Sequence, residues 1–289
     1  MYNSLNGMLT EVANFSGDLA ELIIQNEISK FETTREQVFD TMKTRRQIMA
    51  ASTKTAIDQS DSLKETFITG MAKSQMNYAS GSTLCGELIN KTMARALSAS
   101  EVNAAMGKIC AMPTAGSCGI VPAVIESLGD ELSVSEENLL KAYIVASGMG
   151  ALVVENATVS GAEGGCQAEC GVAAAMASAA AVYLKGGTAG QCVEAFSISL
   201  INIMGLVCDP VAGLVQIPCA QRNASQAVNA LLSADLALGG MKCGINADEV
   251  IESMYRVGKL MPVQHRETSL GGIAVTNSAK AFEEKLKEL

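Results

Sequence analysis

The sequence predicts an all-α fold: a compact multi-helix domain with cysteine-bearing loops between helices. Hydrophobic residues make up 48% of the 289-residue chain, yet aromatic residues make up only 4% and tryptophan does not occur. The apolar mass is therefore aliphatic and methionine-rich, which suits closely packed helices better than an aromatic-rich β-sandwich. Few stretches show the period-two alternation that indicates a half-buried strand. A chain of this length can bury a core in one large domain or two smaller ones.

Polar start signals followed by apolar periodicity define the N-terminal elements. The sequence Ser-Gly-Asp at 16–18 precedes a periodic run to about Ile28. Thr33 and Glu36 have the spacing of a capping box and predict a long helix to about residue 57. Another helix is expected from 61 or 62 to about 78. We expect 1–80 to be a more polar N-terminal helical region that packs on a domain formed by 81–289.

The second region shows further helix signals. Ser133 with Glu136 and Thr188 with Gln191 have capping-box spacing. Residues 171–184 are alanine-rich, and a Gly-Gly pair at 186–187 predicts a left-handed cap. Small side chains allow close helix approach, so we place this helix at the centre of the bundle. The expected helices are 86–97, 101–110, 121–128, 133–154, 171–184, 189–204, 224–238 and 247–258, followed by a polar loop at 264–275 and a charged helical tail.

Charge and hydropathy exclude several classes of function. The net charge of −9 and a pI near 4.8 argue against nucleic acid as a partner, because binding a phosphate backbone needs clustered lysine and arginine. The longest apolar runs, 142–154 and 172–184, are about 13 residues, short of the 18 or more that a membrane span needs. A basic leader is not seen after Met1. We therefore expect a cytoplasmic protein without a membrane segment.

Four of the nine cysteines fall in two glycine-rich segments, 160–171 and 205–224. These are Cys166, Cys170, Cys208 and Cys219. The spacing matches neither paired CxxC zinc motifs nor a ferredoxin run, and the chain has a single histidine, His265. By spacing alone, a metal centre and ordinary buried thiols both stay open. Three cysteines on one 4Fe–4S cluster would leave one iron open as a Lewis acid.

Charged and glycine-rich residues near these segments are candidates for substrate chemistry. Glu163, Arg222 and Glu267 are candidate acid–base or binding groups, with a loop-bracing ion pair as the alternative for Glu163 and Arg222. The Pro-Thr-Ala-Gly-Ser-Cys-Gly sequence at 113–119 precedes a helix start, where N–H groups can cradle a carboxylate. It is not a P-loop, and an ordinary interhelical loop is the alternative. His265 lies in a charged loop and is expected to be solvated, with no Ser-His-Asp triad around it.

Four segments together resemble a known family. PTAGSCG (113–119), SGAEGGCQAECG (160–171), GLVCDPVAGLVQIPCAQRNA (205–224) and RETSLGGIA (266–274) resemble the signature segments of the iron–sulfur-dependent L-serine dehydratases. More narrowly, the chain resembles the α chain of the two-subunit type. The resemblance covers roughly residues 80–275, and its motifs are several, ordered and long.

The resemblance implies a 4Fe–4S cluster held by Cys166, Cys208 and Cys219, with Cys170 left out. L-serine would bind the open iron through its hydroxyl, lose its α-proton and then water, and give pyruvate and ammonia by way of aminoacrylate. An exposed iron would make the enzyme oxygen-sensitive. The residues implied to line the substrate pocket are Thr114, Gly116, Ser117, Gly119, Ser269 and Gly271.

The general base is where the chain departs from the family. Relatives carry a histidine in a Ser-Ser-His-Thr type segment, and this sequence has no such segment. We infer that a separate β chain supplies the base and that this chain alone is inactive or nearly so. The alternatives are a cluster-dependent L-cysteine desulfidase, and a non-catalytic Fe–S sensor or helical interaction protein.

Overall fold

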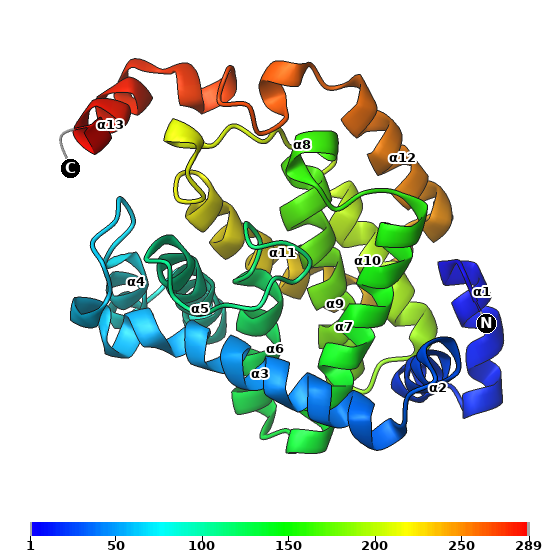
Figure 1. Cartoon of the computed structure of the whole chain (residues 1–289). Helices are drawn as coiled ribbons and strands as arrows, with labels where there is room; N and C mark the ends of the chain where they lie inside the picture. The colour runs from blue at the N-terminus through cyan, green and yellow to red at the C-terminus, as the bar shows by residue number, and fades with distance from the viewer. Residues whose placement is uncertain (1, 288–289) are drawn as a thin grey trace.

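The chain folds as a bundle of helices, which confirms the predicted all-α class. The computed structural model describes residues 2–287, and within them the only extended pairing is an isolated bridge between Cys208 and Arg266. The helices, shown in Figure 1, are α1 (Leu5–Glu11), α2 (Leu19–Phe31), α3 (Arg35–Asp58), α4 (Met71–Ala79), α5 (Gly86–Ala104), α6 (Ile120–Leu132), α7 (Glu136–Asn156), α8 (Gly161–Gly164), α9 (Val172–Leu184), α10 (Ala189–Ile201), α11 (Cys219–Leu238), α12 (Ala247–Leu260) and α13 (Asn277–Lys287).

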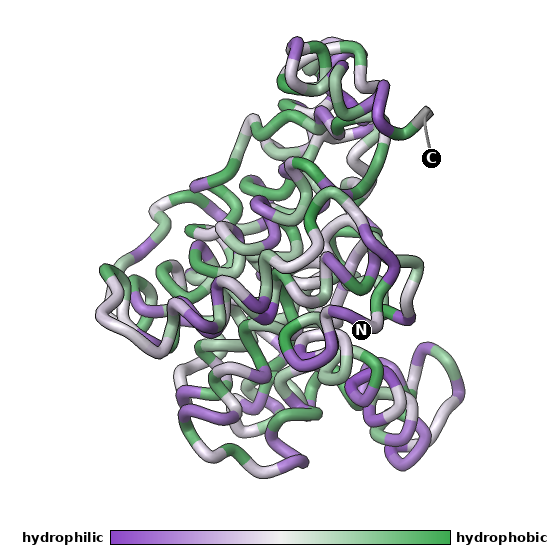
Figure 2. Tube along the Cα trace, turned by 90° about the vertical axis from the view of Figure 1, so that its left-hand side faces the viewer, coloured by the Kyte–Doolittle hydropathy of each residue, from purple (hydrophilic) through white to green (hydrophobic). Residues whose placement is uncertain are grey.

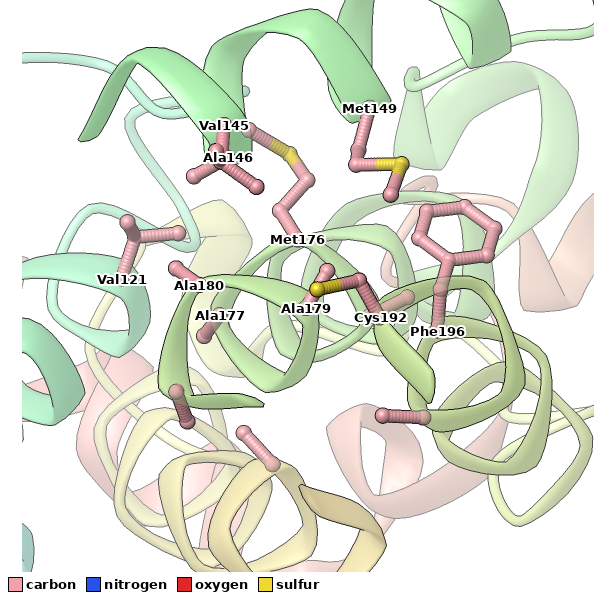
Figure 3. Close-up of a cluster of buried hydrophobic side chains, with 14 of the residues drawn as sticks. Val121, Val145, Ala146, Met149, Met176, Ala177, Ala179, Ala180, Cys192 and Phe196 are labelled. Carbon is pink, nitrogen blue, oxygen red and sulfur yellow. The ribbon is translucent and has the colours of Figure 1, made fainter. Parts of the chain in front are cut away.

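Helix α9 lies at the centre of the bundle, as its alanine-rich sequence predicts. It packs against α6, α7, α10 and α11, and its residues from Val172 to Val182 are all buried. Met176 reaches from α9 towards Val145 of α7, while Phe196 of α10 packs on the adjacent side (Figure 3). A Cβ at Gly150 would lie 2.7 Å from the Met176 methyl carbon, so a larger residue there would make the Met176 side chain shift.

Helix α7 is the one helix in the described residues that is long and apolar enough to cross a membrane by length and composition. Two thirds of its apolar window, 67%, is buried inside the protein. Hydrophobic residues in general concentrate towards the middle of the molecule and hydrophilic ones towards its periphery (Figure 2). The apolar character of α7 is therefore accounted for by its place in the core.

The N-terminal helices pack directly on this core. Arg46 of α3 donates to both carboxylate oxygens of Glu126 on α6, at 2.9 and 3.0 Å, and the Tyr143 hydroxyl of α7 donates to Glu126 Oε1 at 3.0 Å. Leu5 and Met8 of α1 are fully buried in the same hydrophobic cluster as α9. The division of the chain at residue 80 stays a prediction.

Several element boundaries differ from the prediction. A single helix, α5, replaces the expected helices 86–97 and 101–110, and the chain leaves it through Met106, whose φ is +62°. The expected helix 61–78 is reduced to a 3₁₀ turn, Ser60–Ser62, and α4. Glu101 of α5 accepts the N–H groups of Gly70 and Ala72 at 2.8 and 2.6 Å, and so caps α4 from another helix.

Two of the predicted caps are displaced along the chain. The capping box of α3 is Thr34 with Gln37, one residue beyond the predicted pair. Helix α7 is capped by Ser135, whereas Ser133 adopts a left-handed conformation at the end of α6. The spacing of capping residues in the sequence predicts the start of a helix to within one turn, but the hydrogen-bond geometry decides which residue is the N-cap.

Candidate functional site

Three of the four singled-out cysteines lie in or directly before helical elements. Cys166 immediately precedes a π-helical turn, Gln167–Gly171, that runs into α9. Cys170 lies inside this turn, and Cys219 is the first residue of α11, which starts before the predicted residue 224. Only Cys208 lies on irregular backbone. The prediction that all four cysteines lie in loops is therefore not confirmed.

The thiols of Cys166, Cys208 and Cys219 form one electrostatic group. Burial is the main cause of the raised pKa of the Cys208 thiol, and Cys166 and Cys219 raise it further. Burial likewise raises the pKa of Cys219 to about 12, with a further contribution from Cys166. Cys166 and Cys208 are almost fully buried, with exposed fractions of 3% and 5%. The fold thus brings together three sulfurs from three separate segments.

The donor chemistry of these residues is that of iron–sulfur ligands. A 4Fe–4S cluster is bound by thiolates. Cys166, Cys208 and Cys219 supply three thiols whose charges influence one another, with no histidine among them. Among the described residues, no group of three or more histidine, cysteine or acidic side chains converges tightly enough to hold one metal ion.

Cys170 belongs to the same group of thiols, because Cys166 and Cys219 both raise its pKa, whereas the cysteines outside the two segments lie elsewhere. Cys170 is buried, and its thiol hydrogen-bonds to Cys166, which lowers the pKa of Cys166 with help from nearby Arg222. Cys192 is buried in the core between α9 and α10 (Figure 3). Cys243 lies half-buried in the loop before α12, and Cys85 is exposed.

Arg222 fastens the segment that carries Cys208. Its Nη1 donates to the carbonyl of Val207 and its Nη2 to Asp209 Oδ1, both at 2.8 Å. The other oxygen of Asp209 accepts the N–H of Ile273 at 2.8 Å. Arg222 therefore forms the loop-bracing ion pair that was the alternative to a purely catalytic role.

The loop 266–272 packs against the same segment. The N–H of Glu267 donates to the carbonyl of Cys208 at 2.8 Å, and the Ser269 hydroxyl donates to the carbonyl of Pro210 at 2.7 Å. Glu267 and Ser269 both adopt left-handed backbone conformations, with φ of +63° and +57°. Such conformations are costly for residues with a Cβ, so the surrounding contacts must hold them in place. Arg266 Nε is buried without a hydrogen-bond partner, so this loop contains an unsatisfied donor.

The 113–119 loop is held by Asn223, which the sequence analysis did not identify. Its Nδ2 donates to the carbonyl of Gly116 at 2.7 Å, and its Oδ1 accepts the N–H of Gly119 at 2.9 Å. The hydroxyls of Thr114 and Ser117 lie 3.1 Å apart, and Ser117 is completely buried. A Cβ at Gly119 would lie 2.4 Å from the carbonyl of Ala96, so glycine is required at that position.

Glu169 is a second residue that the sequence analysis missed. Its Oε1 accepts the N–H of Gly161 at 3.0 Å, and the Thr114 side chain hydrogen-bonds to the carboxylate. A Cβ at Gly116 would lie 2.5 Å from Oε2, so two glycines leave room for this carboxylate. Burial, followed by the charge of nearby Glu267, raises the pKa of Glu169 to about 7.

A carboxylate whose pKa is raised by burial and by a neighbouring like charge is a candidate functional group, and this one lies beside the 113–119 loop and Glu267. The sequence signal for Glu169 is its place in the glycine-rich cysteine segment 160–171, but its burial depends on packing against the 113–119 loop.

Two further predicted residues, Glu163 and Gly271, differ in their surroundings. Glu163 is exposed on α8, and the nearest cation, Lys259 Nζ, is 3.9 Å from its carboxylate. Gly271 lies tightly against the backbone of Gln264 and the ring of His265, with 2.8 Å left for a Cβ at each contact. The carbonyl of His265 accepts the N–H of Cys208 at 2.9 Å. Apart from the exposed Glu163, the predicted residues lie in the 113–119 loop, in the 266–272 loop and at Arg222, which border or hold the segments that carry the cysteines.

An all-α bundle that brings several thiols, a partly buried carboxylate and a glycine-rich loop together defines the class of protein: a helical protein with cysteines at its candidate functional site. The sequence profile of the family described as serine dehydratase alpha chain matches residues 16–274. The chain belongs to this family of lyases.

Individual relatives are similar over almost the whole chain. A probable L-serine dehydratase, alpha chain, of Bacillus subtilis is 43% identical over 93% of this chain and 89% of its own length. The L-serine dehydratase, alpha chain, of Peptoniphilus asaccharolyticus is 44% identical over 92% of both chains. L-serine dehydratase 1 of Escherichia coli is 45% identical over 62% of this chain, a match that spans 40% of that relative.

Proposed function

We propose that this chain is the α subunit of an L-serine ammonia-lyase that converts L-serine to pyruvate and ammonia. The observation that carries the proposal is the group formed by the buried Cys166 and Cys208 and the half-buried Cys219, beside a loop whose composition suits a carboxylate. Relatives of nearly the same length carry the name L-serine dehydratase, alpha chain, which supports L-serine as the substrate. L-cysteine, the substrate of the alternative desulfidase reaction, is offered in the same assay below.

The cofactor we propose is a 4Fe–4S cluster on these three thiolates. When bound, it supplies a Lewis acid at the iron that no cysteine of the set occupies. Arg222 favours the thiolate form of Cys166, because a cation beside a thiol stabilises its charged form.

The substrate carboxylate is assigned to the 113–119 loop. Thr114 and Gly116 border Glu169, whereas Ser117 and Gly119 face inwards and hold the loop through Thr114 and Asn223. Ser269 and Gly271 set the conformation of the opposite wall. Glu267 contributes a second negative charge beside Glu169. Glu163 is assigned to the exposed outer edge of the site.

The base that removes the α-proton is assigned to a separate β chain. His265 lies in the loop beside Cys208, where its backbone carbonyl accepts the Cys208 N–H. The alpha-chain names of the relatives imply a partner subunit, and the Escherichia coli relative has polypeptide well beyond the matched region. We place the complex in the cytoplasm, because all nine cysteines are free thiols, which a reducing compartment maintains.

Anaerobic purification with iron analysis tests this proposal. We expect brown protein with about four irons per chain, and pyruvate from L-serine only after a β chain is added. Colourless, iron-free protein after anaerobic reconstitution would refute the cluster. Robust pyruvate formation by this chain alone would refute the role of the β chain, and sulfide release from L-cysteine in preference to serine turnover would favour the desulfidase.

A further inference from the structure

The charge of Glu169, a partly buried residue, is poorly compensated compared with the buried carboxylates of the chain. Glu126 has Arg46 and a tyrosine hydroxyl, and Asp209 has Arg222 and a backbone N–H. Glu101 accepts two N–H groups at the start of α4, where the helix dipole favours a negative charge. Each of these three carboxylates therefore has a cation or a helix terminus as a partner.

Glu169 has two neutral donors instead. These are the N–H of Gly161 and the hydroxyl of Thr114, and Glu267 adds a like charge. Within residues 2–287, neither Glu169 nor Glu267 forms a salt bridge with a lysine or arginine. Arg222, the cation beside the thiols, is committed to Asp209 and Val207. A desolvated carboxylate without a cation is unfavourable, so the pocket is electrostatically suited to a positively charged ligand group.

The position of Glu169 indicates which positively charged group of a ligand it would bind. The carboxylate lies against Gly116 of the loop assigned to the substrate carboxylate, and Thr114 belongs to the same loop. A Cβ at Gly161 would meet both Glu169 Oε1, at 2.7 Å, and Cys208 Sγ, at 3.2 Å, so the carboxylate also borders the thiol group. An α-amino acid carries its ammonium and its carboxylate on one carbon atom. A carboxylate next to the carboxylate-binding loop is therefore in the right place for the ammonium.

We propose, on the basis of the function proposed above, that Glu169 binds the α-ammonium group of the amino-acid substrate. The site then selects an amino acid over the corresponding hydroxy acid, because only the amino acid supplies the missing positive charge. Glycerate is the matched probe, since it keeps the carboxylate and the 3-hydroxyl of serine and replaces the ammonium with a hydroxyl.

The test compares Glu169→Gln with wild type in the anaerobic, cluster-loaded complex with the β chain. Loss of a charge-assisted hydrogen bond should raise KM for L-serine by about tenfold or more, with a smaller change in kcat. Inhibition by glycerate should stay the same or strengthen. Glu169→Asp keeps the charge with a shorter reach and should fall between the two. Glu137→Gln, which removes an exposed glutamate at the start of α7, is the matched control and should behave as wild type.

Thermal unfolding of the cluster-free chain is the second readout. Removal of an uncompensated charge should leave Glu169→Gln at least as stable as wild type. A variant that fails to fold or is clearly less stable would make the carboxylate a structural brace and overturn the proposal. So would an unchanged KM for serine, an equal loss of serine and glycerate binding, or a loss confined to kcat.

Failure of the proposed function is distinguishable from failure of this inference. A wild-type complex that forms no pyruvate refutes the proposed function. Calorimetric titration of L-serine and of glycerate into the wild-type and variant chains still decides the role of Glu169: binding of serine that is weakened selectively in Glu169→Gln supports it, and any other pattern overturns it.

Discussion

Arg222 donates from Nη2 to Asp209 Oδ1 at 2.8 Å, and this pair joins the first turn of α11 to the segment that carries Cys208. Both side chains are largely buried, with exposed fractions of 17% and 3%. Because Asp209 also accepts the N–H of Ile273, one carboxylate holds three separate parts of the site in register. The arrangement of the segments around Cys208 therefore depends on this ion pair.

Replacement of Asp209 should destabilise the chain strongly. Asp209→Ala leaves Arg222 buried without its anion, and such a loss costs about 3–5 kcal/mol. The midpoint of urea unfolding measures the effect. Glu252→Ala is the control, because it removes an exposed pair with Arg256 on α12 and should cost below about 0.5 kcal/mol. Equal effects of the two substitutions would contradict the bracing role of Asp209.

Gly272 is a position where alanine should not fit. Its φ is +60°, and a Cβ there would lie 2.1 Å from Asp209 Oδ2. Gly272→Ala should displace Asp209 as well as strain the backbone. Gly205 has a φ of +91° with open space around it, so Gly205→Ala should cost only the strain, about 1–2 kcal/mol. The difference in free energy of unfolding between the two variants isolates the contact with Asp209, and we expect it to exceed about 2 kcal/mol.

The role of the thiols as iron ligands can be tested separately from their contribution to packing. Cys219→Ala should abolish iron retention after anaerobic reconstitution, because it removes one of the three proposed ligands. Cys243→Ala, at a half-buried thiol in the loop before α12, should retain wild-type iron content. Iron per folded chain, with folding checked by circular dichroism, is the measurement. Retention of a full cluster by Cys219→Ala would remove this residue from the ligand set.

Acid should weaken the chain partly through Glu21. Hydrogen bonds from Arg35, with help from Lys141, lower the pKa of Glu21 to about 2. Because the folded-state pKa lies below the unfolded value, this stabilisation is complete above about pH 5 and is lost as the pH falls towards 2. Glu21→Gln should therefore cost on the order of 1 kcal/mol near pH 7, since the carboxylate is partly exposed and screened. The gap to wild type, measured by urea unfolding at each pH, should close between pH 5 and pH 2, and a gap that persisted at pH 2 would contradict this account.

The sequence correctly predicted features that depend only on residues close together in the chain. The capping box of Thr188 with Gln191 and the left-handed Gly186 are both present where the spacing predicts them. The central place of α9 also follows from its composition, because alanine side chains permit close contact on every side. Helix starts were less accurate where the cap comes from elsewhere, as with Glu101 and α4.

The sequence by itself determined the all-α class, the central helix, the three candidate cluster cysteines and the family resemblance, because composition, helical periodicity and long ordered motifs are properties of the chain alone. Only the tertiary structure decided that Asn223 holds the 113–119 loop, that Arg222 is bound to Asp209, and that Glu169 lies beside that loop with no salt bridge to a lysine or arginine of residues 2–287. These relationships join residues that are distant in the chain, or they depend on how deeply a residue is buried. Burial and charge compensation arise when separate segments pack together, so no local pattern encodes them.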